Sequence, residues 1–236
     1  MKLSIVIPIF NEEKTIIPLL ERVVKLVIPG VEKEIIIVDD GSSDSSKFKV
    51  QSSKLKGIKI LSHKKNMGKG AAVITGIKSA KGEYVVIQDA DLEYNPQQIK
   101  KLIKPIQDGK AEVVYGTRLS RLPDFKGEQR TPQFFLHYMG NKFLSLVTSV
   151  IYLQWITDME TCYKLFPKKA TEHFSLKARG FEFEPEITAK LLKLGYKIYE
   201  IPIQVTPRGY DEGKKIHAVK DGLRAVWYLV KYRFVD

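Results

Sequence analysis

The sequence has almost no cysteine and no long uncharged apolar run, and each shortage excludes a class of protein. Its single cysteine, Cys162, excludes an internal disulfide framework and fits a reducing compartment. The longest stretch without a charged residue is 143–157, which is shorter than the ~20 apolar residues that a membrane-spanning helix needs. Polar residues from Asn11 onward end the first apolar run too early for a signal peptide. We therefore expect a cytoplasmic protein.

Acidic residues are also fewer than basic ones. The sequence has 39 lysines and arginines and 27 aspartates and glutamates, which gives a formal net charge of +12. This excess favours an anionic partner: nucleic acid, a phosphorylated small molecule or an anionic membrane surface. Lysine-rich helices that only keep the protein soluble would give the same excess. No helix-turn-helix, zinc-finger or RNA-recognition motif is visible, so a nucleic-acid-binding module ranks last and no nucleic-acid partner is expected.

The first half of the chain alternates between short apolar runs and helical patterns. Strands are predicted over 3–10, 34–40, 57–63, 83–91 and 111–118, and helices over 12–27 and 68–80, with another opening at Asn95-Pro96. This alternation, with strands that are apolar throughout, favours an α/β fold with a mostly parallel sheet flanked by helices. In such sheets ligands bind beyond the carboxyl ends of the strands.

The second half is less regular. Residues 119–133 read as a loop that carries Arg121 and Arg130, and a loop of this length suggests a function. Helical patterns follow at 134–153, 180–196 and 214–234, with a strand at 197–203. The first and last of these helices carry aromatic and basic residues that suit a helix lying on an anionic membrane. Ordinary packing against the sheet would use the same pattern, and both alternatives stay open.

Acidic residues end two of the predicted strands. In VVIQDADLEYNP (85–96), Asp89, Asp91 and Glu93 stand at every second position, and in an extended chain such residues point to the same side. Carboxylates that crowd one face repel one another, and a hard divalent cation would neutralise them. A solvated turn is the alternative, but the position at a strand end favours a metal site.

The second acidic strand end is Asp39-Asp40, followed by Gly41. A carboxylate there can accept hydrogen bonds from a base or ribose, as in dinucleotide folds, or it can cap the next helix. The segment HKKNMGKGAAV (63–73) places glycines and lysines at a helix entry, where backbone N–H groups favour phosphate. It matches neither the P-loop nor the GxGxxG pattern, and by itself is a weak signal.

Together these segments resemble the family 2 glycosyltransferases, and within them the polyprenyl-phosphate sugar synthases. The resemblance covers nearly the whole chain, and several motifs in order are more specific than any one of them. They are VIPIFNEE (6–13), EIIIVDDGSSDSS (34–46), NMGKGAAVITGI (66–77), VVIQDADLEYNP (85–96), YGTR (115–118), TDMETCYKLF (157–166), GFEFEPEITAKL (180–191) and RGYDEGKKI (208–216).

The resemblance implies a GT-A fold in one continuous domain. Residues 1–118 would form the half that binds a nucleotide sugar, and residues 119–236 the half that binds the acceptor. By position in the family's motifs, the nucleotide would contact Pro8, Phe10, Glu12, Ile37 and Asp39.

The resemblance also assigns the phosphate and metal contacts. Asp89, Ala90 and Asp91 match the motif that holds Mg²⁺ or Mn²⁺ and the donor diphosphate, and Glu93 is a further candidate ligand. Glu93 stands where mannose synthases often carry glutamine, which leaves the donor sugar open. Arg118 matches a phosphate-binding arginine. The basic pair Arg208 and Lys214 would close on the diphosphate or the acceptor.

The chemistry of such a transfer agrees with these residues. Negative charge builds on the leaving nucleotide, and a metal on Asp89 and Asp91, with Arg208 and Lys214, would stabilise it. A polyprenyl phosphate acceptor needs no general base, because a phosphate monoester with a second pKa of about 6 is already largely ionised. Arg118, together with Arg121 and Arg130 of the following loop, would hold that phosphate through forked hydrogen bonds.

We therefore expect a metal-dependent inverting hexosyltransferase that uses a UDP- or GDP-sugar and polyprenyl (dolichyl) phosphate. Such an enzyme would be peripheral on the cytoplasmic face of a membrane, with a membrane-protein partner as one possibility. The alternative is a transferase that glycosylates a sugar hydroxyl in polysaccharide or glycoprotein assembly. It would need a catalytic carboxylate, for which Glu184 and Glu186 are the candidates by position.

Overall fold

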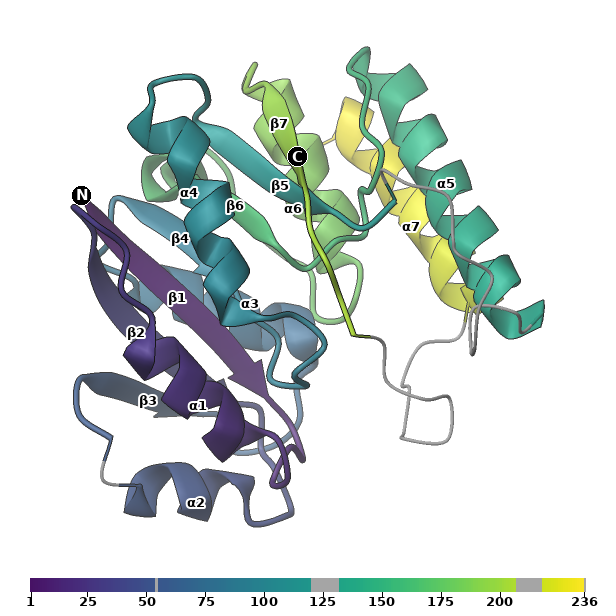
Figure 1. Ribbon diagram of the computed structural model, residues 1–236. Coiled ribbons are helices and arrows are strands. Elements are labelled where there is room, and N and C mark those ends of the chain that lie inside the picture. Colours follow the sequence, from purple (N-terminus) through teal and green to yellow (C-terminus); the bar gives the residue numbers. More distant parts are fainter. Residues whose placement is uncertain (54, 120–131, 207–217, 236) are drawn as a thin grey trace.

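The computed structural model describes residues 1–53, 55–119, 132–206 and 218–235, and within them the strands form one seven-stranded mixed sheet (Figure 1). The strands are β1 (Lys2–Ile9), β2 (Glu32–Asp39), β3 (Ile58–Ser62), β4 (Tyr84–Ile87), β5 (Val113–Thr117), β6 (Lys164–Pro167) and β7 (Ile198–Pro202). Their order across the sheet is β3-β2-β1-β4-β6-β5-β7. All pairs are parallel except those that β6 makes with β4 and β5. The predicted mostly parallel α/β sheet is confirmed.

Helices cover both faces of this sheet. They are α1 (Ile16–Lys25), α2 (Ser46–Ser52), α3 (Lys69–Ser79), α4 (Ile99–Gln107), α5 (Pro132–Tyr152), α6 (Phe183–Lys193) and α7 (Ala218–Phe234), with 3-10 turns η1 (Pro96–Gln98) and η3 (Lys168–Glu172). In Figure 1, α1 and α4 lie in front of the sheet and α3 behind it. No helix in the described part of the chain is both long and apolar enough to cross a bilayer.

The central strands are buried because helices cover them on both sides. Every residue of β1 from Leu3 to Ile9 is buried, and so is β2 from Ile35 onward. The apolar residues of α1 recur at helical spacing, and Ile16, Leu19, Leu20 and Val23 all face the core. The continuous apolar runs therefore predicted these strands to within two residues.

Strand β6 was not predicted. It has only four residues, begins with a lysine and ends with a proline, so it carries no usable strand pattern. Its register pairs Val85 of β4 with Phe166, and Val114 of β5 with Leu165. The antiparallel insertion separates β4 from β5, so the two strand ends that carry the candidate site residues are not neighbours in the sheet.

Candidate active site

The acidic loop, residues 88–94, follows β4 and is not extended. The strand ends at Ile87, and Leu92 has a left-handed φ of 65°. The Glu93 amide donates a hydrogen bond to Asp91 Oδ1 (3.1 Å), which closes a tight turn of the kind that aspartate favours. The expected alternation of Asp89, Asp91 and Glu93 along one strand face is therefore wrong.

The turn nevertheless brings the carboxyl groups of this loop close to one another. The pKa of Asp91 is raised to about 7, first by burial and then by the charges of Asp89 and Glu93, while Lys69 opposes the rise. Carboxylate oxygens in such an arrangement are the ligands that Mg²⁺ and Mn²⁺ prefer. No three His, Cys, Asp or Glu side chains within the described residues are placed to enclose a metal by themselves. The loop fits a divalent ion whose remaining ligands come from outside the described residues.

Lys69, the first residue of α3, occupies the other side of Asp89. Its Nζ lies 2.8 Å from both carboxylate oxygens of Asp89 and 3.8 Å from Glu184 Oε1. Burial lowers the pKa of Lys69, but the neighbouring carboxylates outweigh it and hold that pKa well above its usual value. A metal at Asp89 would therefore compete with this ammonium for the carboxylate oxygens. The sequence showed that Lys69 stands among glycines, but it gave no sign that Asp89 and Glu184 are its partners.

A second layer of charged side chains lies beneath this pair. Glu184 of α6 forms an ion pair with the fully buried Lys164 of β6 (2.6 Å). Glu160 lies nearby, and its pKa is raised to about 7 by burial and then by the charge of Glu184. Glu160 Oε1 is buried, and no hydrogen-bond partner for it exists within the described residues.

Among the described residues of this region, carboxyl groups outnumber cations. Six carboxyl groups lie with three cations: Asp89, Asp91, Glu93, Asp158, Glu160 and Glu184 with Lys69, Arg118 and Lys164. A divalent cation would add positive charge where these carboxyl groups gather.

Arg118, at the end of β5, is held by Asp158. Its Nε and Nη2 donate to the two carboxylate oxygens at 2.8 and 2.7 Å, and its backbone N–H donates to the same side chain at 2.8 Å. Asp158 is fully buried, whereas 21% of the Arg118 side chain is exposed. One edge of the guanidinium is thus committed to Asp158, and the remaining N–H groups are the ones that a phosphate could use.

The loops after β1 and β2 are joined at the same edge of the sheet. Glu12 N donates to Ser46 Oγ (2.7 Å), and Ser43 N donates to Asn11 Oδ1 (2.8 Å). Asn11 adopts a left-handed φ of 56° to make this contact. Asp39, buried at the end of β2, accepts from the amide of Ser42 (3.2 Å). Glu12 and Asp39 thus lie on two loops that are linked by hydrogen bonds.

Other predicted nucleotide contacts lie deeper. Phe10 is half-buried at the surface, but Pro8 and Ile37 are buried within β1 and β2. Ile37 has no exposed surface, so its side chain is a core residue in this structure. Ala90 is also buried, beside the acidic pair.

The helix entry at α3 does not present the open anion site that its glycines and lysines suggested. The amides of Met67 and Gly68 donate to Asp40 (2.9 and 2.7 Å), and Ala71 N donates to Arg179 O (3.1 Å). Gly68 has φ 100°, and a Cβ on it would lie 2.2 Å from Arg179 O. The glycine allows the segment before α6 to cover the helix entry, and Asp40 ties the loop together.

Four predicted basic contacts fall outside the described residues: Arg121, Arg130, Arg208 and Lys214. The described chain reaches Thr206, whose amide donates to Glu93 O (2.9 Å).

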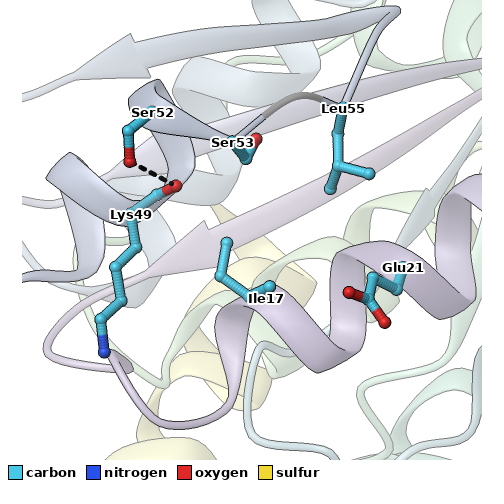
Figure 2. Close-up of a pocket in the computed structure, with 6 residues that line it drawn as sticks. All are labelled: Ile17, Glu21, Lys49, Ser52, Ser53 and Leu55. Atoms are coloured by element: carbon cyan, nitrogen blue, oxygen red, sulfur yellow. Dashed lines mark hydrogen bonds between the residues drawn. The ribbon is translucent and has the colours of Figure 1, made fainter.

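A surface hollow of about 350 Å³ lies between α1 and α2 and is lined by none of these groups (Figure 2). It contains no predicted site residue and carries no chemistry that would make it the active site. Its lining residues are Ile17, Glu21, Lys49, Ser52, Ser53 and Leu55.

Comparison with proteins of known structure supports the fold. Glucosyl-3-phosphoglycerate synthase from Mycobacterium tuberculosis, solved with Mn²⁺, UDP and phosphoglyceric acid, superposes with a TM-score of 0.73 at 19% identity. The match covers 100% of this chain and 79% of that one. The fold is therefore the GT-A fold of glycosyltransferases.

Sequence comparison identifies the family. Dolichol-phosphate mannosyltransferase from Pyrococcus furiosus is 30% identical over 237 residues, and dolichyl-phosphate beta-glucosyltransferase from Trichomonas vaginalis is 28% identical over 244 residues. Each match covers 98% of this chain, but only 64% of the first relative and 71% of the second. Residues 4–174 match glycosyl transferase family 2. The chain belongs to that family and is a glycosyltransferase.

Proposed function

We propose that the protein is an inverting glycosyltransferase that moves mannose or glucose from a UDP- or GDP-sugar to polyprenyl (dolichyl) phosphate. The observation that carries the donor half is the gathering of carboxyl groups in the acidic loop, at the sheet edge where Glu12 and Asp39 also lie. The names of the two curated relatives support the acceptor half.

On the donor side, Asp89 and Asp91 would hold Mg²⁺ or Mn²⁺ together with the diphosphate. The bound ion would stabilise the negative charge that develops on the leaving nucleoside diphosphate. Lys69 adds a cation next to Asp89, within reach of the same phosphates once it leaves the carboxylate. Glu12 and Asp39 would accept hydrogen bonds from the nucleoside, and Arg208 and Lys214 would close on the phosphates.

On the acceptor side, a phosphate nucleophile needs positioning rather than deprotonation. The two carboxylates that the sequence offered as bases are already engaged. Glu184 is paired with Lys164, and Glu186 is fully buried and accepts hydrogen bonds from Lys190 and from the amides of Lys177 and Ala178.

The open N–H groups of Arg118 would hold the acceptor phosphate, with Arg121 and Arg130 from the loop that follows. The bidentate pairing with Asp158 fixes the guanidinium in one orientation, so little conformational entropy is lost when it binds phosphate.

A second candidate is transfer to a sugar hydroxyl, and Glu160 favours it. A carboxyl with a pKa near 7, and with a buried oxygen that has no hydrogen-bond partner in the described part of the chain, has the properties of a general base. Glu160→Gln separates the two functions. Activity on polyprenyl phosphate would persist, whereas a reaction that used Glu160 as base would fall by about 10²- to 10⁴-fold.

The test is a matrix of UDP- and GDP-linked glucose and mannose against three acceptors: a polyprenyl phosphate, 3-phosphoglycerate and a free oligosaccharide. The proposal predicts a lipid-linked hexose of inverted anomeric configuration with one of the donors. Turnover only with phosphoglycerate or the oligosaccharide would contradict it.

A further inference from the structure

Helices α5 and α7 each expose a stripe of large apolar side chains. On α7 the stripe consists of Leu223, Trp227, Val230 and Phe234, with Trp227 65% exposed. On α5 it consists of Phe135, Leu136, Met139, Phe143, Leu146 and Val150, and the exposed Leu153 and Trp155 follow that helix. The residues in each stripe recur every three or four positions, so they share one helix face.

These stripes are not the faces that pack against the protein core. Ala225, Leu229 and Tyr232 of α7 are buried, and they lie on the side of the helix opposite Trp227. On α5 the buried residues, such as Leu144, likewise oppose the exposed stripe. Each helix is therefore apolar on two sides, and within the described chain nothing covers the outer one. A monomeric soluble protein rarely leaves apolar surface of this kind exposed.

The two helices form one unit. Figure 1 shows α5 and α7 side by side at one end of the molecule, and Tyr152 OH donates to Leu229 O (2.8 Å) to join them. This unit also adjoins the candidate active site, because Lys142 Nζ of α5 donates to the carbonyl of Leu119, the residue after Arg118 (2.6 Å).

The charge on these helices indicates what covers the apolar stripes. The side chains that the structure describes on them include four cations and no acid, a net charge of +4: Lys142, Arg224, Lys231 and Arg233. A second copy of the chain would bring the same positive charge and be repelled. An anionic bilayer would attract the cations at its head groups and take the apolar side chains below them. Exposed tryptophans such as Trp155 and Trp227 suit the boundary between these layers.

We propose that the outer faces of α5 and α7 form a docking surface for an anionic lipid bilayer. The reason for such docking rests on the proposed function, since a polyprenyl acceptor is held in a bilayer. Binding itself requires neither donor nor acceptor, so it is tested on vesicles that contain no polyprenyl phosphate.

The chain offers a selective reporter, because its only two tryptophans are both exposed, Trp227 on this surface and Trp155 in the turn that follows α5. Vesicles of phosphatidylcholine with 30% phosphatidylglycerol should shift the intrinsic fluorescence to shorter wavelength. Lipids brominated on the acyl chain should quench it. Vesicles of phosphatidylcholine alone should bind at least about tenfold more weakly, as should anionic vesicles in high salt.

Substitutions then locate the contact. Leu223→Ser with Phe234→Ser should lower vesicle affinity at least about tenfold, because each removes a large apolar side chain from the bilayer. Phe48→Ser on α2 is the matched control, since Phe48 is 71% exposed but remote from this surface, and its affinity should not change. Thermal unfolding of both variants checks that the fold is intact.

Failure of the wild type to bind anionic vesicles would overturn the inference, as would an equal loss in Phe48→Ser. A concentration-dependent dimer that the Leu223→Ser, Phe234→Ser variant dissociates, without vesicle binding by the wild type, would assign the surface to a second copy instead. Vesicle binding without hexose transfer to any polyprenyl phosphate would leave the docking surface standing and refute the proposed function alone.

Discussion

Glu160→Gln should stabilise the protein at pH 8 much more than at pH 5. Glu160 titrates near pH 7 in the folded chain, against about 4.5 when unperturbed. The folded state therefore holds the proton more tightly than the unfolded chain. As the pH rises from 4.5 through 7, the unfolded chain releases its proton first, and the free energy of unfolding falls.

The size of the effect follows from that difference in pKa. About 1.4 kcal/mol per pH unit over this window gives a loss of about 3 kcal/mol, complete above pH 7. Glutamine keeps the shape and cannot ionise, so the variant avoids the loss. For a chain of this length, 1 kcal/mol corresponds to about 2–4 °C in Tm, which predicts a gain of about 6–12 °C at pH 8. At pH 5 the gain should be about 1–4 °C.

The assay is differential scanning calorimetry of wild type and variant at both pH values, with EDTA present so that no metal alters the charges. Glu21→Gln, an exposed carboxyl on α1, is the control and should show no pH-dependent gain. An equal shift for Glu160→Gln at pH 5 and pH 8, or a loss at pH 8, would refute the reasoning.

Three further predictions concern other parts of the site. Gly68→Ala should cost about 3 kcal/mol or more, seen as a lower urea midpoint, because alanine is strained at φ 100° and its Cβ meets a backbone carbonyl at 2.2 Å. Asp158→Ala should cost about 3–5 kcal/mol by the same assay, since it removes the buried carboxylate that pairs with Arg118. Lys69→Met should raise Mn²⁺ affinity about tenfold without nucleotide, measured by electron paramagnetic resonance, because the ammonium no longer competes for Asp89.

Each of these three predictions has a control variant or an outcome that would contradict it. Gly140→Ala, where a Cβ meets nothing within 4 Å, should leave stability unchanged or slightly higher, and an equal loss at both glycines would contradict the close-approach argument. A Tm for Asp158→Ala within about 1 °C of wild type would mean that the pair contributes little. Unchanged or weaker Mn²⁺ binding by Lys69→Met would show that the lysine does not compete with metal.

The sheet was largely predictable because its strands repeat one simple pattern. Strands β1 and β2 are continuous apolar runs between polar turns, and both ends fall within two residues of the prediction. Strand β6 was missed because four residues carry no period, and its Lys164 is buried only because Glu184, twenty positions later, neutralises it. Such a pairing is a tertiary event that local sequence does not encode.

The candidate site was predictable only in part, from residues that follow a recognisable strand. The position of Asp89 and Asp91 at a strand end pointed to this edge of the sheet, although the turn at Leu92 was not foreseen. The partners of these residues come from distant segments, such as Lys69 beside Asp89 and Asp158 beside Arg118. Forty residues separate Arg118 from Asp158, and no spacing rule connects them.

The most direct test of the central claim is a calorimetric titration of the wild type with UDP and GDP, in Mn²⁺ and in EDTA, repeated with Asp91→Asn. The account predicts that one nucleotide binds at least tenfold more tightly with Mn²⁺, a difference of about 1.4 kcal/mol, and that Asp91→Asn loses this difference while remaining folded. Equal nucleotide affinity with and without Mn²⁺, or a metal effect that survives in Asp91→Asn, would contradict it.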